Sequence, residues 1–482
     1  MATIPSVETS GVTPPLTLPV RTSLGFWDVV SLNIGIVIGA SIFKVPGSVF
    51  ELCGSPAAAL ALWGLGALLA LAGALCYAEL AAAYPAFGAE YVYLGRAYGH
   101  QIGFLFGWIQ TFVILPTSVG AMAFVFAAYG GEVWPAVQSQ PGLTAAAAIA
   151  GLSILQLIGF QVGRIAQNLL TGIKVLSLLG VVVCGLFLSP PVEVVAAVPS
   201  EKISWSGLGL ALVFVFYAYG GWSDVARVTP EVRDCRRTMP RGLITGLSII
   251  AVIYLLLNLS FLNSLGDDAV RHVTAPAAEV VRRTLGSRFS VLMSLVVMAS
   301  ALGAIHGMLF SGCRLLAAIG EDYRLFRKWN SWNARHVPVW ALLTLSLISL
   351  ATTALVGTKI GRESIDRFLI LLRLAPADLE KYGGGFEVLV TASSSVFWGF
   401  FLLSGLAVIV LRMRDPLRAR PFRVPLYPVT PLIFIAICGY MLWSVGSYAG
   451  KLTLLMIPAI LPGILLAFLQ RRPANNSSRD PD

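Results

Sequence analysis

The sequence is poor in charged residues. Only 12% of its 482 residues are charged, whereas 57% are hydrophobic, and the mean hydropathy is +0.80. A soluble domain carries about 25% charged residues, so the composition excludes an ordinary soluble protein. Most of the chain must face lipid or its own buried interior.

Histidine and cysteine are also scarce. A membrane enzyme needs a cluster of histidine, cysteine or acidic residues at one depth, and the four histidines are scattered (His100, His272, His306 and His336). We therefore predict that the protein is not an enzyme and binds no metal or cofactor. For His306 we expect only a local hydrogen bond. The six cysteines include no CxxC pair and are typical of small apolar packing residues.

Long apolar runs fill the chain instead. A run of about 20 residues can cross a hydrocarbon core of about 30 Å, and twelve such runs predict an all-α integral membrane protein with 12 transmembrane helices. The runs are 26–53, 56–83, 101–130, 143–163, 166–189, 205–231, 240–265, 286–319, 338–357, 390–413, 426–447 and 452–470.

The distribution of basic residues predicts the orientation. If the N-terminus is cytoplasmic, 21 of the 34 Lys and Arg residues fall in cytoplasmic segments, 12 fall outside and one, Lys174, lies at membrane depth. This is the positive-inside bias, so the net charge of +10 does not indicate a nucleic-acid partner. We expect a multi-pass protein of the cell membrane with both termini in the cytoplasm.

Two tails flank one transmembrane domain, which we place at 24–470. Residues 1–23 are rich in Thr, Ser and Pro and lack the basic and apolar regions of a signal peptide, so we expect a disordered cytoplasmic tail. Residues 471–482 form a similar C-terminal tail.

Glycines interrupt two of the apolar runs at matching places, within 33–43 and 216–224. A membrane span normally satisfies its own backbone groups, and paired breaks in the two halves of a transporter indicate its central site. We predict two inverted five-helix repeats, about 26–189 and 205–413, each opening with a broken helix. Helices 11 and 12, about 426–470, stand outside the repeat.

The breaks suit a zwitterion. The half-helix that begins near Gly39, Ala40 and Ser41 offers backbone N–H groups and a positive dipole end to a carboxylate. Carbonyl groups around Val37, and others near Tyr217 and Gly220, can accept from an ammonium group. The alternative is that the glycines only allow close helix packing.

Between 357 and 385 the chain carries a basic insert. Ile365, Phe368, Leu369 and Leu372 follow helical spacing, which predicts a short amphipathic helix at the outer interface. A solvated loop is the alternative.

The sequence resembles the amino acid–polyamine–organocation superfamily, and within it the L-type amino acid transporters and their bacterial relatives. The resemblance covers 24–447 and rests on five motifs in order. They are 39–43 (GASIF), 77–80 (YAEL), 167–174 (QNLLTGIK), 217–222 (YAYGGW) and 420–425 (RPFRVP). It implies a LeuT-like fold of five-plus-five inverted repeats with helices 1 and 6 broken. The serine and second glycine of the family's helix 1 are Ala40 and Ser41 here.

The resemblance implies roles for individual residues. Tyr217 is expected to gate the site, although an aromatic residue on a helix is more often plain packing. The expected substrate-binding residues are Val37, Gly39, Ala40, Ser41, Ile42, Tyr217, Gly220 and Ser223.

Lys174 is the most informative single residue. It lies about ten residues beyond Arg164, or roughly 15 Å along the helix, so its side chain of about 6 Å cannot readily reach the interface. An ammonium at that depth costs at least about 2.5 kcal/mol. The resemblance implies that it replaces a coupling sodium ion, tying helix 5 to carbonyls near Gly35 and to helix 8; a structural lysine is the alternative.

We therefore expect a sodium-independent secondary transporter, an exchanger or facilitator of neutral L-amino acids. The alternatives are a cationic amino acid or polyamine carrier, a proton-coupled symporter and a non-transporting sensor. The expected partners are the amino acid and the lipid bilayer. No disulfide-linked heavy chain is expected, because the 131–142 loop lacks the cysteine of animal relatives.

Overall fold

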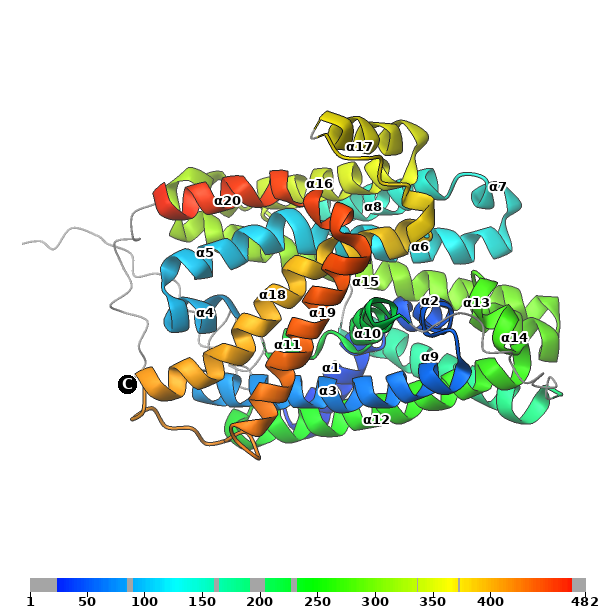
Figure 1. Cartoon of the computed structure of the whole chain (residues 1–482), viewed down its shortest axis with the longest axis horizontal. Coiled ribbons are helices and arrows are strands. Elements are labelled where there is room, and N and C mark those ends of the chain that lie inside the picture. Colours follow the sequence, from blue (N-terminus) through cyan, green and yellow to red (C-terminus); the bar gives the residue numbers. More distant parts are fainter. Residues whose placement is uncertain are drawn as a thin grey trace, which may run out of the picture.

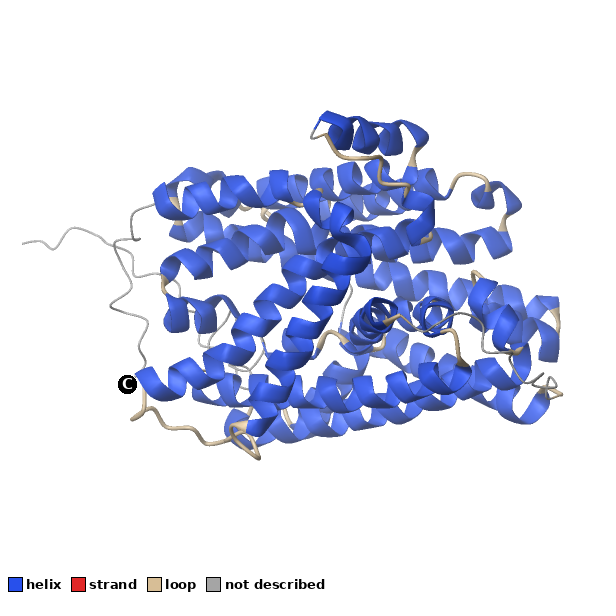
Figure 2. Cartoon of the chain, in the orientation of Figure 1, coloured by secondary structure: helices blue, strands red, loops and turns tan. Residues whose placement is uncertain are grey.

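A computed structural model describes residues 24–84, 90–159, 164–190, 204–226, 232–335, 337–371 and 373–469. Helices make up nearly all of this part of the chain, and its only extended pairings are two isolated bridges (Figure 2). The all-helical prediction is confirmed. The predicted tails, 1–23 and 471–482, lie outside the described residues.

Eight segments of the described chain are long and apolar enough to cross a membrane. They are α3 (Pro56–Ala83), α5 (His100–Ile109) with η2 (Gln110–Ile114) and α6 (Leu115–Val133), α9 (Arg164–Val183) with η3 (Cys184–Leu188), α12 (Cys235–Leu265), α15 (Ser287–Asp322), α16 (Val339–Gly357), α18 (Gly385–Arg414) and α19 (Val429–Leu454).

Four shorter apolar helices occupy the remaining predicted spans. They are α1 (Phe26–Val37), α8 (Pro141–Leu157), α10 (Trp205–Tyr219) and α20 (Ile457–Leu469). Two of them, α1 and α10, are short because the chain breaks after them. The other helices are η1 (Ala40–Phe43), α2 (Val45–Cys53), α4 (Glu90–Tyr98), α7 (Pro135–Gln138), α11 (Trp222–Ala226), α13 (Asp267–His272), α14 (Pro276–Leu285), η5 (Arg324–Asn330), α17 (Lys359–Leu371) and η6 (Leu379–Tyr382).

The first break follows from local backbone geometry. Ile38 leaves the helical region, with φ −72° and ψ 78°, and Gly39 is fully extended. The 3₁₀ turn η1 follows, and α2 then begins with Pro46 in its first turn, where the missing N–H costs nothing. A left-handed Gly54 ends α2, and the Ser55 side chain caps α3.

The second break depends on two adjacent glycines. Gly220 is extended, and Gly221 has φ +108°, a backbone conformation that residues other than glycine rarely adopt. A Cβ atom on Gly221 would also lie 2.8 Å from the Cγ2 of Ile36 on α1. The absence of a side chain at 221 therefore lets the two broken segments touch.

The broken segments lie in the middle of the molecule. In Figure 1, α1, α2, α10 and α11 lie between the α3–α12 pair and the α6–α15 pair, while α18 and α19 cross obliquely. Each of these pairs packs directly together, as do α1 with α12, α10 with α2, and α18 with α19. Elements from both halves of the chain thus surround the breaks.

The amphipathic helix predicted in the insert is α17. Ile365 and Leu369 are buried, whereas Ile360 and Leu371 are largely exposed. Figure 1 shows α17 at the edge of the molecule, and Gly361 lies against the Ala354 carbonyl at the end of α16. The helix prediction is confirmed, and the loop alternative is wrong.

Candidate functional site

A buried tyrosine from α12 joins the two breaks. The Oη of Tyr254 lies 3.2 Å from the carbonyl oxygen of Val37, at the end of α1, and 3.2 Å from that of Ala218, near the end of α10. The Gly39 amide also donates to the Val37 carbonyl, at 2.7 Å. Two carbonyl groups released by the breaks therefore converge on one hydroxyl.

Sequence reasoning missed Tyr254. Its ring packs against Trp63 and Tyr219, with centroids 5.8 and 5.1 Å away, and the residue is fully buried. The signal in the sequence was a tyrosine within the apolar stretch 249–257 (IIAVIYLLL). Its partners could not be read there, because they lie 217 and 36 residues away.

The expected carboxylate side of the site is formed by η1. Ala40, Ser41 and Ile42 are all buried, and the Ser41 carbonyl accepts from the Lys44 amide at 2.9 Å. The hydroxyl of Tyr129 on α6 donates to the carbonyl of Phe43, at 2.8 Å. The 3₁₀ turn after Gly39 is thus fixed to the neighbouring span.

Tyr217 lies between the second break and α18. Its ring meets Phe386 edge to face, with centroids 5.8 Å apart. Its hydroxyl is buried towards Ser118 of α6 but makes no hydrogen bond of ordinary geometry. The Tyr217 carbonyl accepts from the Gly220 amide at 3.3 Å, and Ser223 is buried in α11. A planar ring thus stands beside the break without a strong polar tether.

Lys174 lies on α9 and faces α15. The side chain is 6% exposed and borders a cavity of about 190 Å³, which is also lined by Leu295, Val296, Ala299 and Ser300 of α15 and by Ile173. The structure gives its ammonium group no hydrogen bond or ion pair with the described residues. The helix that carries Lys174, α9, therefore contacts α15, which is the eighth of the predicted spans, as the resemblance implies.

Gly35 lies near the same helix but not beside the lysine. A Cβ atom at Gly35 would lie 2.9 Å from the Oγ1 of Thr171, which is one turn before Lys174 on α9. The structure brings α1 and α9 together at this point and shows no bond from Lys174 to an α1 carbonyl.

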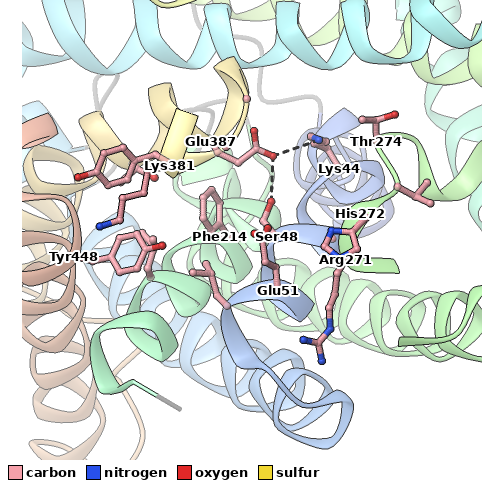
Figure 3. Close-up of a pocket in the computed structure, with 18 residues that line it drawn as sticks. Lys44, Ser48, Glu51, Phe214, Arg271, His272, Thr274, Lys381, Glu387 and Tyr448 are labelled. Carbon is pink, nitrogen blue, oxygen red and sulfur yellow. Dashed lines mark hydrogen bonds and ion pairs between the residues drawn. The ribbon is translucent and has the colours of Figure 1, made fainter. Parts of the chain in front are cut away.

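A second cavity, the charged recess, lies one turn of α10 away from Tyr217. It has a volume of about 170 Å³, and its lining includes Lys44, Ser48, Arg271, Lys381 and Glu387. Figure 3 shows Lys44 and Ser48 pointing towards Glu387. The lysine Nζ lies 3.4 Å from a carboxylate oxygen of Glu387, and the serine hydroxyl donates to the same oxygen at 3.1 Å. The second half of the first broken span, α2, is thereby tied to α18.

A buried ion-pair network lies elsewhere, between α3 and α18. Glu79 accepts two hydrogen bonds from Arg412, at 2.7 and 2.6 Å, and one from the Val424 amide at 2.6 Å. Arg420 lies 3.8 Å away. Glu79 thus joins α3, α18 and the segment before α19, which the sequence did not indicate.

His306 makes the local bond expected of it. Its Nδ1 and its carbonyl oxygen lie 3.0 and 2.7 Å from the Nε2 of Gln156 on α8. Among the described residues, no three His, Cys, Asp or Glu side chains are placed to hold a metal ion. The six cysteines all lie in this part of the chain and are free thiols.

Comparison with known proteins decides the family. The model of the amino acid permease family matches residues 24–463. The chain belongs to the amino acid permease family. The resemblance to the amino acid–polyamine–organocation superfamily and its L-type transporters is thereby confirmed, and the permease is a multi-pass membrane protein with several apolar helices.

Three curated relatives are each 26% identical to this permease. The serine/threonine exchanger SteT of Bacillus subtilis (strain 168) aligns over 88% of this chain and 91% of its own length. The b(0,+)-type amino acid transporter 1 of Homo sapiens aligns over 94% and 89%. The cystine/glutamate transporter of Homo sapiens aligns over 86% and 78%. The alignments extend over nearly the whole of this permease.

Proposed function

We propose that this permease is a sodium-independent secondary transporter that exchanges neutral L-amino acids across the membrane by alternating access. The observation that carries the proposal is the meeting of the two breaks, where the Val37 and Ala218 carbonyls converge. Relatives named as exchangers and amino acid transporters support the same activity.

The proposal includes the fine architecture. Twelve spans would form two inverted repeats, 26–189 and 205–413, followed by two further helices at 426–470, with both termini in the cytoplasm. The breaks fall in the first span of each repeat, after Val37 and after Tyr219. Such paired discontinuities are typical of transporters that bind their substrate near the bilayer midplane.

The substrate's two charged ends would bind on opposite sides of the first break. Its carboxylate would lie at η1, where Ala40, Ser41 and Ile42 start a new half-helix with its positive dipole end. Its ammonium would lie at the carbonyls of Val37 and of the α10 end. Tyr217 would cover the site, with Gly220 and Ser223 as further contacts from the second break.

Neutral side chains would be preferred because the breaks carry no acid. Neither 33–43 nor 216–223 contains Asp or Glu, and the centre of the second break is Gly220 and Gly221, which have no side chains. A cationic side chain desolvated there would lack a counter-charge, which is strongly disfavoured. Asp224 is the nearest acid in the sequence and lies on α11, beyond the break.

Lys174 would take the place of a coupling sodium ion. Its ammonium is buried between α9 and α15, and α9 also contacts Gly35 of α1. A fixed positive charge between these helices removes the need for a bound cation. Transport is therefore expected to proceed at the same rate when choline replaces sodium.

The proposal is tested by counterflow in proteoliposomes. Labelled alanine, serine, leucine, arginine and glutamate are compared, each with and without unlabelled substrate inside, in sodium and in choline, and with or without a pH gradient. Faster counterflow of neutral amino acids, independent of sodium, supports the proposal. Faster counterflow of arginine would indicate a cationic amino acid carrier. Dependence of uptake on the pH gradient would indicate a proton-coupled symporter, and substrate binding without flux would indicate a sensor.

A further inference from the structure

We propose that the cavity between α9 and α15 binds the carboxyl group of a long-chain fatty acid, which enters from the lipid and pairs with the ammonium group of Lys174. The binding site stands on the geometry of the cavity alone. Its effect on transport rests on the proposed exchange, in which Lys174 replaces a coupling sodium ion.

Two buried polar groups line this cavity. Lys174 is 6% exposed and Ser300 is 1% exposed. The Oγ of Ser300 has no hydrogen-bond partner among the described residues, and the lining includes no Asp or Glu that could pair with the lysine. An ammonium group offers three donors and no acceptor. The cavity therefore lacks an anionic acceptor. Its other lining residues are all apolar: Ile173, Leu295, Val296 and Ala299.

The cavity is reached from the lipid side. Ile173 is 38% exposed and Leu295 is 41% exposed, and Ala299 is exposed as well. These residues lie on α9 and α15, which are both long and apolar enough to cross a membrane, so their exposed side chains face hydrocarbon. A ligand that enters here needs an apolar chain beside its anionic group.

The depth of Lys174 favours a fatty acid over a phospholipid. The residue lies about 15 Å from Arg164 and about 21 Å from Leu188 along the helix, far from either interface. A phospholipid would bring a phosphate and further polar groups, which this apolar lining could not satisfy. A fatty acid brings one carboxyl group, and its pairing with the ammonium leaves no net charge in the hydrocarbon.

A fatty acid can also reach this depth and fit there. It crosses hydrocarbon as the neutral acid far more easily than as the anion, and the ammonium then favours release of its proton to the aqueous phase. The cavity volume of about 190 Å³ far exceeds the ~10–15 Å³ that one water molecule needs. It has room for the carboxyl group and the first part of the chain, and the rest lies along Leu295 and Ala299.

The bound acid is expected to slow exchange. Helices α9 and α15 pack together, and Lys174 lies between them. In the proposed exchange the charge of this lysine substitutes for sodium, and a paired carboxylate would neutralise that charge. The cavity is thus a regulatory site that opens to the bilayer.

Photolabelling tests the site without any need for transport. The full chain in proteoliposomes is labelled with a palmitic acid analogue that carries a diazirine beside its carboxyl group, and the labelled peptides are identified by mass spectrometry. The label is expected at 295–300 and at Ile173. Excess oleate should remove it. Oleyl alcohol should compete about tenfold less well or worse, because a hydrogen bond between charged groups is stronger than one to a neutral hydroxyl.

Three variants separate the ammonium from the cavity. Lys174→Met keeps a long side chain but removes the charge, and labelling should fall about tenfold or more. Ala299→Phe fills the cavity and should reduce labelling as much; Val296→Phe replaces it if that variant does not insert. Ala351→Phe is the matched control, because Ala351 is an exposed alanine on α16 away from the cavity, and it should be labelled as strongly as the wild type.

Counterflow tests the regulation. Oleate should slow amino acid exchange by the wild type and by Ala351→Phe. Ala299→Phe should exchange at close to the wild-type rate and be at least about fivefold less sensitive to oleate. Lys174-dependent labelling with no effect of oleate on wild-type exchange would overturn the regulatory role.

The binding site itself would be overturned by equal labelling of the wild type and Lys174→Met, or by a label confined to other segments. Displacement of the label by phosphatidylglycerol as effectively as by oleate would overturn the assignment to a fatty acid. Absence of counterflow for every amino acid in the wild type, with labelling that still depends on Lys174, would instead overturn the proposed exchange and leave the site intact.

Discussion

Glu79 is predicted to be the most stabilising single carboxylate among the described ion pairs. It is 2% exposed and accepts three short hydrogen bonds, which join α3 to Arg412 on α18 and to the Val424 amide before α19. Glu79→Gln keeps the shape of the side chain but removes its charge. The amide group then presents N–H donors to an arginine that also only donates.

The magnitude follows from burial. Breaking a buried ion pair costs about 3–5 kcal/mol, because one charge stays buried without its partner. Arg412 is 19% exposed and keeps some hydration, so we expect the lower end, about 3 kcal/mol. An unfolding entropy of about 2.1 cal/mol/K per residue gives roughly 1 kcal/mol/K for a chain of this length. The melting temperature should therefore fall by about 3 °C.

The assay is thermal unfolding of the purified protein in detergent. Glu363→Gln on α17 is the matched control, because its pair with Arg367 is exposed, with the side chains 49% and 82% accessible and 3.8 Å apart. Exposed pairs contribute about 0–1 kcal/mol, so this variant should have the same melting temperature as the wild type.

A double variant tests the mechanism. Glu79→Leu alone leaves Arg412 unpaired, whereas Glu79→Leu with Arg412→Met removes both charges and should melt closer to the wild type. The reasoning is refuted if Glu79→Gln and Glu363→Gln have the same melting temperature. It is also refuted if the double variant melts no higher than Glu79→Leu.

Three further predictions concern the breaks and the buried lysine. Lys174→Ala should reduce exchange to below about 10% of wild type without lowering the melting temperature, since a buried ammonium is itself costly; wild-type counterflow would show that the residue is only structural. Tyr217→Ala should raise KM and slow exchange, whereas Tyr217→Phe should retain much of the wild-type affinity and exchange rate. If the Ala and Phe variants had identical kinetics, the gate would lie elsewhere. Gly221→Ala should lower both stability and exchange, because its Cβ would meet Ile36 at 2.8 Å and its φ is +108°. Gly151→Ala, which meets no atom within 4 Å, should leave both unchanged, and equal effects of the two alanines would contradict the packing argument.

Local features of the fold were predictable from the sequence because they depend on neighbouring residues. Gly39, Gly220 and Gly221 mark both breaks, since a glycine pair in an apolar run permits backbone that other residues avoid. The spacing of Ile365 and Leu369 predicted α17, because the period of a helix is written in consecutive residues. Counting along its span placed Lys174 far from the end of the helix, and the residue is 6% exposed in the structure.

Partner choice was decided only by the tertiary structure. A span that is apolar all round does not show which face meets which neighbour, so periodicity could not place Tyr254 beside Val37, 217 residues away. The same holds for Glu79 and Arg412, which are 333 residues apart. Lys44 and Glu387 met for the same reason, through the packing of α2 against its neighbours. Composition and local geometry determined where the chain forms apolar helices and where these break, whereas the rotation and packing of whole helices determined which polar groups the breaks bring together.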